Sequence, residues 1–358
     1  MNALIFAGGT GSRLWPASTK NNPKQILSFF GEETMLQKTY NRIASAIPSN
    51  KIFVATSSAY KQPVKKQLSK IPAKNFLYEP VRKNRGPAIG VMMLFLETYS
   101  KDPYFTTVWS DDHINQEDIY HYNLQLIERY LNKNPQQILA IGVYPSYPNV
   151  SFRYVETGKI ISSETIPIFN VKKFHDKPNL VKAKKMYLSG KHFWNTGYFI
   201  SSTQAILDLY KKHFPECYKI LEKIRPYMGT KKQDEIIEKL YKEMPSFDFE
   251  EIFYSNPDLL KLVPANFDWM DIGRWGAVKD VQSDKNDNLE KGLVVSHGTE
   301  ACLIYNYNPK QLVSTLHVNN LVVVVTPDAV LVADKDKTED LKKIIEKLNA
   351  DVNLKKYL

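Results

Sequence analysis

Short apolar runs that alternate with helical patterns restrict this chain to few fold classes. Four runs in the first half of the chain end in loops, at residues 3–7, 52–55, 105–109 and 138–143. Runs this short, apolar on both faces, are typical of strands buried in a parallel sheet. Because helical patterns lie between them, the sequence predicts an α/β fold with a Rossmann-like, doubly wound, mostly parallel sheet. In such sheets ligands bind at the carboxyl ends of the strands.

The helical patterns begin at recognisable signals. Thr34 and Gln37 have the spacing of a capping box. Pro87 suits the first turn of a helix that continues to Glu97. Two sets of residues have helical spacing and predict core-facing stripes: Leu36, Tyr40, Ile43 and Ile47, and then Ile119, Tyr122, Leu126 and Tyr130.

The pattern changes after a polar, turn-forming cluster at residues 283–288. Beyond it, short β runs follow one another without intervening helices, and only residues 338–348 have a helical pattern. The sequence therefore predicts two domains. The first is a large domain over residues 1–282, and the second is a small β-rich module over residues 283–358 that ends in a helix.

Composition excludes several classes of protein. The chain has 358 residues, of which 43% are hydrophobic and 24% charged, as in an ordinary globular protein. Its 48 Lys and Arg residues against 38 Asp and Glu give a net charge of +10. A basic surface attracts nucleic acid, anionic lipid and phosphorylated ligands alike. Because the positive charge is distributed and forms no long basic block, we predict no nucleic-acid partner.

Cysteine usage and the N-terminal sequence predict a cytoplasmic protein. Cys217 and Cys302 lack the spacing of a zinc or redox motif, which favours a reducing compartment. The first apolar run has no basic segment before it and is too short for a signal peptide. No apolar stretch approaches the roughly 18 residues of a membrane span, so we predict no membrane partner.

The most specific motif is the glycine-rich loop after the first apolar run. Gly8, Gly9 and Gly11 let backbone N–H groups approach a polyphosphate, and Arg13 and Lys24 supply cationic donors in the same region. The spacing fits neither a dinucleotide fingerprint nor a Walker A loop. The alternative interpretation of these glycines is a tight strand-to-loop turn that binds no ligand. The two cations in the same region argue against that alternative.

The segment Gly8-Gly-Thr-Gly-Ser-Arg-Leu-Trp-Pro16, followed by Pro23-Lys-Gln25, resembles the sugar-1-phosphate nucleotidylyltransferases. Its Leu-Trp-Pro ending is similar to the mannose-1-phosphate guanylyltransferase branch. Five later segments resemble that branch in the same order: Glu79-Pro80 with Asn84 and residues 87–89, Asp112-His113, residues 174–178, residues 194–197 and residues 267–275.

The resemblance implies a complete set of site residues. Two cations would act in catalysis, Arg13 and Lys24. The implied nucleotide-binding residues are Gly8, Gly9, Thr10, Gly11, Ser12, Glu79, Asn84 and Gly86. The implied sugar-phosphate residues are Glu156, Lys177 and Asn195. Mg²⁺ would be held by Asp112 and Asp271, with Asp111 as the competing choice beside Asp112.

Residue chemistry suits these roles. Glu79 offers the acceptor that the N–H donors of guanine need, Lys177 is a point charge for a phosphate, and Asn195 can donate to and accept from sugar hydroxyls. For His113 a hydrogen-bonded structural role is favoured over metal binding, and for Trp194 packing is favoured.

The implied reaction transfers GMP from GTP to a sugar-1-phosphate, with α-D-mannose 1-phosphate giving GDP-mannose and pyrophosphate. A sugar-1-phosphate is largely dianionic at pH 7, since its second pKa is about 6. It is therefore already a nucleophile, and a single in-line displacement with Mg²⁺ needs no covalent enzyme intermediate.

The chain departs from the family pattern at the sugar edge. Where the family has Thr-Gly-Tyr-Gly-Tyr-Ile-Glu, this chain has Val150-Ser-Phe-Arg-Tyr-Val-Glu156, and Arg153 adds a bulky cation. Three other positions differ: Arg85-Gly86 stands for Thr-Ala, Ser110-Asp111 for Pro-Ala, and Asp176 for Glu. Two alternatives follow, namely the same chemistry on another hexose- or heptose-1-phosphate, and a catalytically silent homologue that binds a nucleotide sugar. The retained Arg13, Lys24, Asp112 and Asp271 argue against the silent homologue.

The C-terminal module resembles the short left-handed β-helix of the same family. Its expected role is packing or self-association as a homodimer. The run from Leu321 to Val325 could form a flat face that pairs between subunits, or it could be core. The sequence leaves these two alternatives open.

Overall fold

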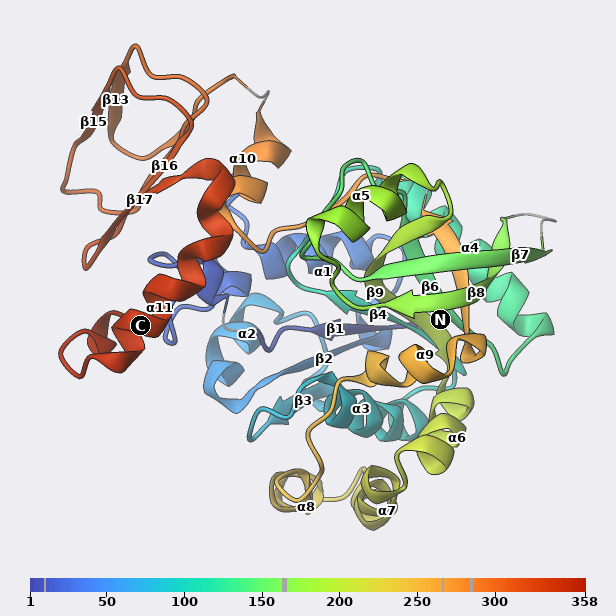
Figure 1. Cartoon of the computed structure of the whole chain (residues 1–358). Coiled ribbons are helices and arrows are strands. Elements are labelled where there is room, and N and C mark those ends of the chain that lie inside the picture. The colour runs from blue at the N-terminus through green and yellow to red at the C-terminus, as the bar shows by residue number, and fades with distance from the viewer. Residues whose placement is uncertain (10, 163–165, 266, 284–285) are drawn as a thin grey trace. The chain divides into compact units, whose positions relative to one another are not determined.

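The computed structural model describes residues 1–9, 11–162, 166–265, 267–283 and 286–358 (Figure 1). These residues form two compact units. Unit 1 comprises Met1–Gly8, Tyr40–Trp109 and Ile114–Asp268, and unit 2 comprises Gly9–Thr39, Ser110–His113 and Trp269–Leu358. Each unit is thus assembled from separated stretches of chain. The boundary expected after residue 282 stays a prediction, and the cluster at 283–288 lies partly outside the described residues.

Unit 1 is built on a nine-stranded sheet, counted over the described residues. Its order is β3-β2-β1-β4-β9-β6-β10-β8-β7. The strands are β1 (Asn2–Phe6), β2 (Ile52–Ser57), β3 (Phe76–Glu79), β4 (Tyr104–Trp109), β6 (Ile138–Val143), β7 (Tyr154–Ser162), β8 (Ile168–His175), β9 (His192–Ser202) and β10 (Leu260–Ala265). Only β8 and β9 oppose the other described strands, so the predicted mostly parallel sheet is confirmed.

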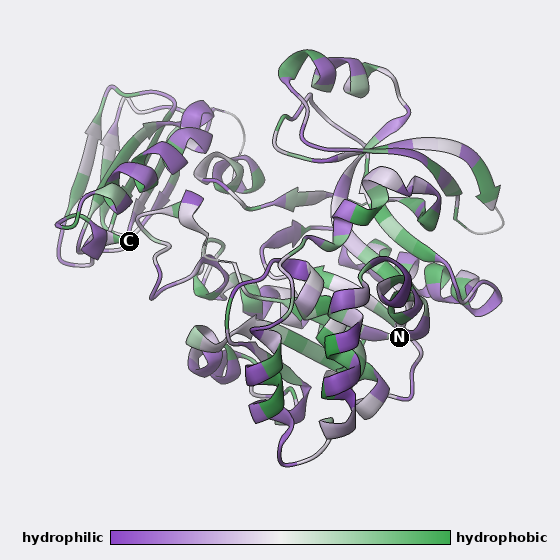
Figure 2. Ribbon diagram, turned by 60° about the horizontal axis from the view of Figure 1, so that its bottom comes forward, coloured by the Kyte–Doolittle hydropathy of each residue, from purple (hydrophilic) through white to green (hydrophobic). Residues whose placement is uncertain are grey.

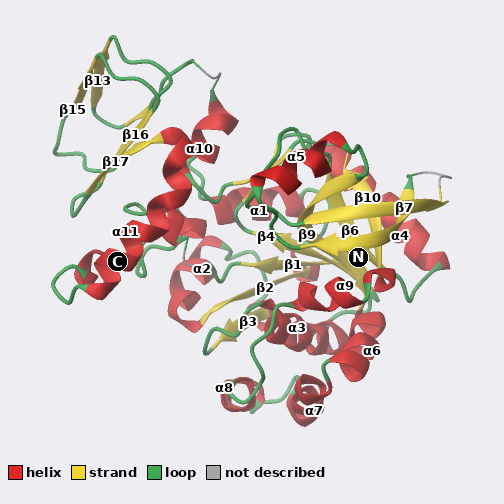
Figure 3. Ribbon diagram, viewed as in Figure 1, coloured by secondary structure: helices red, strands yellow, loops and turns green. Residues whose placement is uncertain are grey.

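The four apolar runs predicted as strands are β1, β2, β4 and β6. All five residues of β1 are buried, as expected for a central strand covered on both faces. The strands accordingly appear mostly hydrophobic in Figure 2, and Figure 3 shows the helices that flank them.

The helices of unit 1 are α2 (Lys61–Gln67), α3 (Arg85–Tyr99), α4 (Glu117–Lys133), α5 (Leu180–Leu188), α6 (Thr203–His213), α7 (Pro215–Ile224), α8 (Gln233–Tyr241) and α9 (Ile252–Ser255). Helix α1 (Met35–Ala44) crosses the boundary between the units.

The helices cover both faces of the sheet. Helix α3 packs with α6 and α7 on one face, and the same hydrophobic core includes Phe199 of β9. Neighbouring residues of a strand point to opposite faces. The next side chain along, Tyr198, contacts Tyr120 of α4 at a ring distance of 5.9 Å. Helix α4 therefore covers the other face.

The start of α1 confirms the capping box. The Gln37 backbone N–H donates to Thr34 Oγ1 at 3.2 Å, and the Thr34 N–H donates to Gln37 Oε1 at 3.0 Å. The predicted stripe of Leu36, Tyr40, Ile43 and Ile47 is buried throughout.

The predicted stripe on α4 is wrong at Tyr122, although the helix itself is confirmed and Leu126 is buried as predicted. Tyr122 is 58% exposed, whereas Tyr120 is fully buried. The inward face is set by Tyr120, whose ring also packs edge-on against Phe267 at 5.3 Å. That partner is distant in sequence, so helical spacing alone could not choose between two adjacent stripes.

Unit 2 contains the β-rich module and a short pair of strands. A four-stranded sheet has the order β12-β14-β16-β17, and β13 pairs with β15 in a second sheet, both taken over the described residues. Pairing from β12 to β14 to β16 is parallel, as is that of β13 with β15, so successive β runs stack in coils. The elements are β5 (Asp112–Ile114, whose last residue belongs to unit 1), β11 (Trp269–Asp271), α10 (Trp275–Gln282), β12 (Leu289–Lys291), β13 (Val294–His297), β14 (Leu303–Asn306), β15 (Val313–Leu316), β16 (Leu321–Val325), β17 (Val330–Asp334) and α11 (Leu341–Ala350). The predicted β-rich module with a final helix is confirmed.

The run from Leu321 to Val325 is core, which decides between the two alternatives. Val322 and Val324 are fully buried, and β16 lies between β14 and β17. Its backbone edges are therefore already paired within the chain.

Both cysteines are buried and free. Among the described helices, none has the length and apolar character needed to cross a bilayer.

The core of unit 2 is organised around Trp275. Its indole is fully buried, donates a hydrogen bond from Nε1 to Trp15 O at 3.0 Å, and packs edge-on against Phe29 and Tyr305. Tyr305 OH in turn donates to Phe29 O at 2.8 Å. One side chain thus joins the loop region near residue 15, helix α10 and strand β14.

We expect truncation of Trp275 to destabilise unit 2 selectively. Trp275→Ala should cost about 3–5 kcal/mol, the usual range for removing a buried aromatic side chain. Trp275→Phe keeps an aromatic ring but loses the indole hydrogen bond, so we expect a cost of about 1–2 kcal/mol. Native-state hydrogen exchange measures this, with amides of β14 and β16 reporting on unit 2 and amides of β1 and β4 as the internal control. Unchanged protection of β14 and β16 in Trp275→Ala would contradict the central role of this residue.

Candidate functional site

The sheet edge of unit 1 gathers several of the predicted residues. Gly8 follows β1, and Glu79 is the last residue of β3, so both stand at the carboxyl edge of the parallel strands. Strand β9 runs in the opposite direction, and Asn195 in its first half pairs with Gly142 near the end of β6. Asn195 therefore lies at the same edge. This is the edge where ligands were expected from the sequence.

Glu79 lies against the glycine loop in a poorly solvated position. A Cβ atom built on Gly8 would lie 3.3 Å from Glu79 Oε1. Tyr241 OH donates to the other oxygen, Oε2, at 2.7 Å. Burial raises the pKa of Glu79, and the Tyr241 hydrogen bond and the charge of Arg82 offset only part of that rise. The carboxylate thus keeps Oε1 directed towards Gly8 while Oε2 is held by the fold.

The base-loop residues Asn84 and Gly86 are tied to a distant segment. Asn84 precedes α3 with a φ of 59°, and its Nδ2 donates to Ser246 Oγ at 3.4 Å. The Gly86 N–H donates to Phe247 O at 3.1 Å, and Gly86 O accepts from Tyr210 OH at 2.6 Å. A Cβ on Gly86 would lie 2.3 Å from the Phe247 ring, so packing alone explains the glycine. Nucleotide binding by Gly86 stays a prediction.

Two arginines that distinguish this chain from the family pattern meet at one pair of carboxylates. Arg85 binds Asp248 Oδ2 and Glu250 Oε1, each at 2.8 Å. Arg153 binds the same two residues, with 3.1 Å to Asp248 Oδ2 and a close ion pair to Glu250 Oε2. Glu250 is 1% exposed. Burial by itself raises the pKa of Asp248, but the charge of Arg85 and its hydrogen bond outweigh it, so that pKa is lowered.

Asp248 and Glu250 were missed by the sequence analysis. The sequence did hold an indication of these two carboxylates, since the two added arginines near a buried sheet edge require compensating negative charges. The alternation Phe247-Asp248-Phe249-Glu250 places acidic residues between buried aromatic ones. The bulky cation expected at residue 153 is therefore neutralised within unit 1. The Arg85 guanidinium also lies 5.0 Å from the Trp109 ring, beside Gly197.

The three predicted sugar-phosphate residues lie on different elements of unit 1. Asn195 is in β9, where its N–H donates to Arg153 O at 2.9 Å, and its buried Oδ1 has no hydrogen-bond partner in the described part of the chain. Glu156 is in β7 and accepts from Lys172 Nζ at 2.7 Å. Lys177 follows β8 and is exposed. Trp194 packs edge-on against Tyr147 and Phe152, as the packing role predicted.

Unit 2 holds the predicted phosphate loop and its cations. Thr10 lies outside the described residues. Gly11 has a φ of 66° and leads into a short helical turn that begins at Ser12. A Cβ on Gly11 would lie 2.5 Å from Lys24 Cβ, so the Lys24 side chain passes directly over this glycine. A residue other than glycine would therefore be strained here and would displace Lys24.

Lys24 is held by a carboxylate that the sequence left as an alternative. Its Nζ forms a close ion pair with Asp111 Oδ2. Burial by itself lowers the pKa of Lys24, but the charges of Asp111 and Asp271 outweigh that effect, so its pKa is raised and it stays protonated at neutral pH. Asp111 thus positions a cation.

Arg13 and the two predicted metal ligands complete the cluster in unit 2. A Cβ on Gly273 would lie 3.1 Å from both carboxylate oxygens of Asp271 and 3.2 Å from Arg13 Nη2, so these two groups flank one glycine. Asp271 ends β11, which pairs with β5, and Asp112 begins β5. The residues next to them bond directly, from Ile272 N to Asp111 O at 3.1 Å.

The donor set of Asp112 and Asp271 fits a hard divalent cation. Both side chains are carboxylates on neighbouring strands, and Mg²⁺ prefers oxygen ligands with few from the protein itself. Asp112 is 4% exposed, and His113 beside it packs on the Phe30 ring at 5.1 Å. The arrangement combines carboxylates for a cation with Lys24 and Arg13 for anionic oxygens, which is the chemistry that a polyphosphate requires.

Comparisons with known proteins identify the family of both parts of the chain. Residues 2–288 match the family described as nucleotidyl transferase, and residues 292–348 match the MannoseP isomerase/GMP-like beta-helix domain. A mannose-1-phosphate guanylyltransferase of Escherichia coli K12 is 30% identical over 358 residues, covering 97% of this chain and 73% of the relative. One of Klebsiella pneumoniae is 29% identical, covering 96% and 73%.

A solved structure shows the same fold along nearly the whole chain. It is that of a mannose-1-phosphate geranyltransferase from Thermus thermophilus, with a TM-score of 0.85 at 24% identity. The match covers 97% of this chain and 99% of that one. Because the nucleotidyl transferase model spans residues 2–288 of the 358, the chain belongs to the nucleotidyl transferase family.

Proposed function

We propose that this enzyme transfers GMP from GTP to α-D-mannose 1-phosphate, giving GDP-mannose and pyrophosphate. The observation that carries the proposal is the cluster of Lys24, Arg13, Asp111 and Asp271 beside the glycine loop of unit 2. Two cations and carboxylates at one glycine-rich loop suit the binding of a triphosphate with its metal. The names of the related enzymes support mannose as the sugar.

Glu79 would select the base. Guanine presents two adjacent N–H donors on its Watson–Crick edge, and a carboxylate can accept from both. Oε2 is engaged by Tyr241, while Oε1 faces Gly8. A hydrogen bond made to this poorly solvated carboxylate is stronger than the same bond in water.

Asn195 and Glu156 would bind sugar hydroxyls, and Lys177 the sugar phosphate. The support for Asn195 is its buried Oδ1, because a buried acceptor without a hydrogen bond is costly unless a ligand supplies the donor. Lys177 is exposed and can move to meet a phosphate as a point charge. The Arg85 and Arg153 guanidinium groups are already neutralised by Asp248 and Glu250, so they add little net charge for a second anion.

The proposed reaction is one displacement at the α-phosphorus of GTP. A phosphate oxygen of the dianionic sugar-1-phosphate forms the new bond to that phosphorus, the bond to the β-phosphate oxygen breaks, and pyrophosphate leaves. Lys24 and Arg13 would hold the anionic oxygens in place and stabilise the charge on the leaving group. Lys24 remains protonated for this role because Asp111 and Asp271 raise its pKa. The loop N–H groups orient the chain of phosphates.

Asp112 and Asp271 are the residues that would hold Mg²⁺. When bound, Mg²⁺ supplies positive charge that neutralises phosphate oxygens and reduces the repulsion between two anionic substrates. The other charges and hydrogen-bond donors that act on the phosphates in the proposed step come from side chains and backbone N–H groups of this chain.

Pyrophosphate release in a matrix of nucleoside triphosphates and sugar-1-phosphates, with Mg²⁺, tests the proposal directly. We expect the greatest rate for GTP with mannose-1-phosphate. Activity confined to another hexose- or heptose-1-phosphate would instead assign the altered segment at residues 150–153 as the specificity determinant. A matrix without activity, together with retained binding of GTP, would overturn the proposal and favour a silent binding homologue.

We expect Asp112→Asn and Asp271→Asn each to lower kcat by about 100-fold or more, since loss of metal-assisted charge neutralisation costs several kcal/mol. Asp268→Asn is the matched control, because this exposed carboxylate lies one residue before β11. Steady-state kinetics with circular dichroism of each variant separates catalytic loss from misfolding. Near-normal turnover in a folded Asp271→Asn variant would refute the metal assignment.

Glu79→Gln should lower kcat/KM for GTP by about 10- to 100-fold, because an amide cannot accept from both guanine donors. Tyr241→Phe leaves the carboxylate in place and should have a smaller effect. In the wild type, burial raises the pKa of Glu79, so GTP binding should weaken as the pH falls through that raised pKa and Glu79 becomes protonated. The Gln variant should lack this weakening, and identical pH profiles for the two proteins would contradict base reading by Glu79.

A further inference from the structure

Three strands of unit 1 bring together two histidines and a carboxylate. Glu156 lies in β7, His175 ends β8 and His192 begins β9. The strand register pairs Glu156 with His192, and pairs Tyr154, two residues away on β7, with His175. Glu156 Oε2 is 3.6 Å from His175 Nε2 and 4.0 Å from His192 Nε2. One nitrogen of each ring and this oxygen all lie within 4.8 Å of one another.

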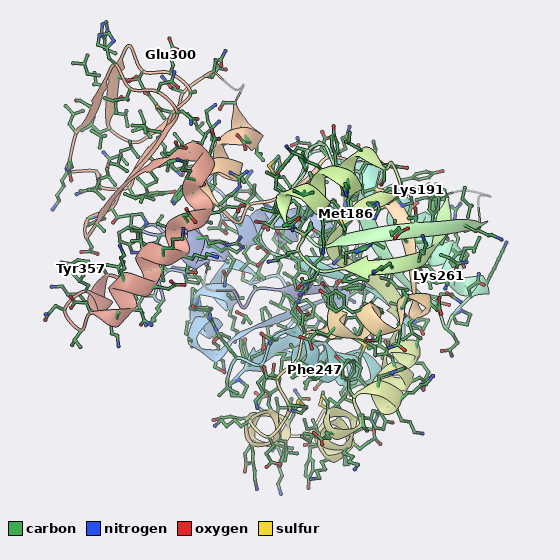
Figure 4. All side chains as sticks on the ribbon, in the orientation of Figure 1. Met186, Lys191, Phe247, Lys261, Glu300 and Tyr357 are labelled. Atoms are coloured by element: carbon green, nitrogen blue, oxygen red, sulfur yellow. The ribbon has the colours of Figure 1, made fainter. Side chains whose placement is uncertain are left out.

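Hydrogen bonds fix the protonation of the His192 ring. Ser189 Oγ donates its single proton to Met186 O at 2.7 Å. His192 Nδ1 lies 2.6 Å from the same Oγ, and with the hydroxyl proton directed to Met186 O it is the donor in that contact. In the neutral imidazole, Nε2 then carries a lone pair that faces Glu156. Figure 4 labels Met186 and Lys191, which bracket this turn.

Neighbouring groups favour neutral histidines beside an ionised carboxylate. Burial lowers the pKa of both His175 and His192, and the charges of nearby lysines lower them further. The hydrogen bond from Lys172 lowers the pKa of Glu156. The buried His175 Nε2 makes no hydrogen bond within the described part of the chain. At neutral pH, His192 Nε2 and the carboxylate thus face each other as electron-pair donors, an arrangement that a cation between them would stabilise.

We propose that Glu156, His175 and His192 form a binding site for a divalent transition-metal ion of the Zn²⁺ class. Zinc binds imidazole nitrogen and carboxylate oxygen at about 2.0–2.2 Å, which sets neighbouring tetrahedral ligands about 3.3 Å apart. The separations of 3.6 and 4.0 Å between Glu156 and the two histidines are close to that spacing, and the two ring nitrogens lie within 4.8 Å of each other. The Ser189 contact to His192 supplies the second hydrogen bond that metal-bound imidazoles make as a rule.

This site differs in chemistry from the carboxylates proposed for Mg²⁺. Two imidazole ligands favour zinc and its neighbours, whereas an all-oxygen set favours Mg²⁺. Three protein ligands leave a fourth position open to an oxygen ligand such as water or a hydroxyl. The site shares Glu156 with the residues proposed for sugar binding, but its test measures metal binding by the chain without nucleotide or sugar, so failure of one proposal leaves the other intact.

Zinc titration of the chelator-treated full-length protein, in competition with a chromophoric chelator, tests the site. We expect one Zn²⁺ per chain, and with Co²⁺ a visible absorption band typical of four-coordinate nitrogen and oxygen ligation. His175→Ala and His192→Ala should each weaken Zn²⁺ binding by at least about tenfold, as loss of a direct ligand requires. His297→Ala is the matched control, since it removes one ring of a histidine pair in unit 2, 5.4 Å from His317.

Lys172→Gln gives a prediction of the opposite sign. Removing the ammonium group that contacts Glu156 should tighten Zn²⁺ binding, because a positive charge no longer competes for the carboxylate. Lys172 is exposed, so this variant should fold normally and keeps the test decisive even where a histidine variant fails to fold. Absence of stoichiometric Zn²⁺ binding by the wild type would overturn the proposal. It would equally be overturned by loss of binding in His297→Ala with retention in His192→Ala.

Discussion

The packing of Trp275 is the interaction on which the structure around the predicted phosphate loop depends. A glycine-rich loop has little conformational preference of its own, so its geometry must come from the structure that holds it. Trp275 donates to Trp15 O and packs on Phe29, which fixes the stretch between Gly11 and α1 to the core of the β-rich module. The module at the end of the chain therefore supports the loop near its beginning, within one compact unit.

Two charge clusters of this protein use burial for different purposes. In unit 2, Lys24 forms an ion pair with Asp111. The charge of Asp271 also raises the pKa of Lys24, so two carboxylates together keep this lysine protonated. In unit 1, Arg85 and Arg153 are matched by Asp248 and Glu250. Removing one partner of such a closed network is strongly destabilising, and the complete network adds little net charge. The first cluster suits binding of anions, and the second suits positioning of strand ends.

Glu156 illustrates how strand register gives one residue two kinds of partner. It lies in the segment expected to meet a sugar, and the pairing of β7 with β9 sets it opposite His192. A shift of one residue in that pairing would turn its side chain to the other face and dissolve the cluster with His175. The same register places the Arg153 carbonyl within hydrogen-bond distance of the Asn195 N–H. The proposed sugar contacts and the proposed metal ligands are therefore products of one sheet edge.

By itself the sequence determined the features that depend on neighbours in the chain. The capping box at Thr34 and Gln37, the buried runs of β1 and β4 and the glycine loop beside Arg13 follow from local spacing, since caps, periodicity and backbone freedom act over a few residues. Only the tertiary structure decided which stripe of α4 faces inward, which carboxylates neutralise Arg153, and that His175 and His192 meet at Glu156. Those outcomes depend on residues far apart in sequence, whose approach is fixed by sheet register and by the packing of large side chains such as Tyr120.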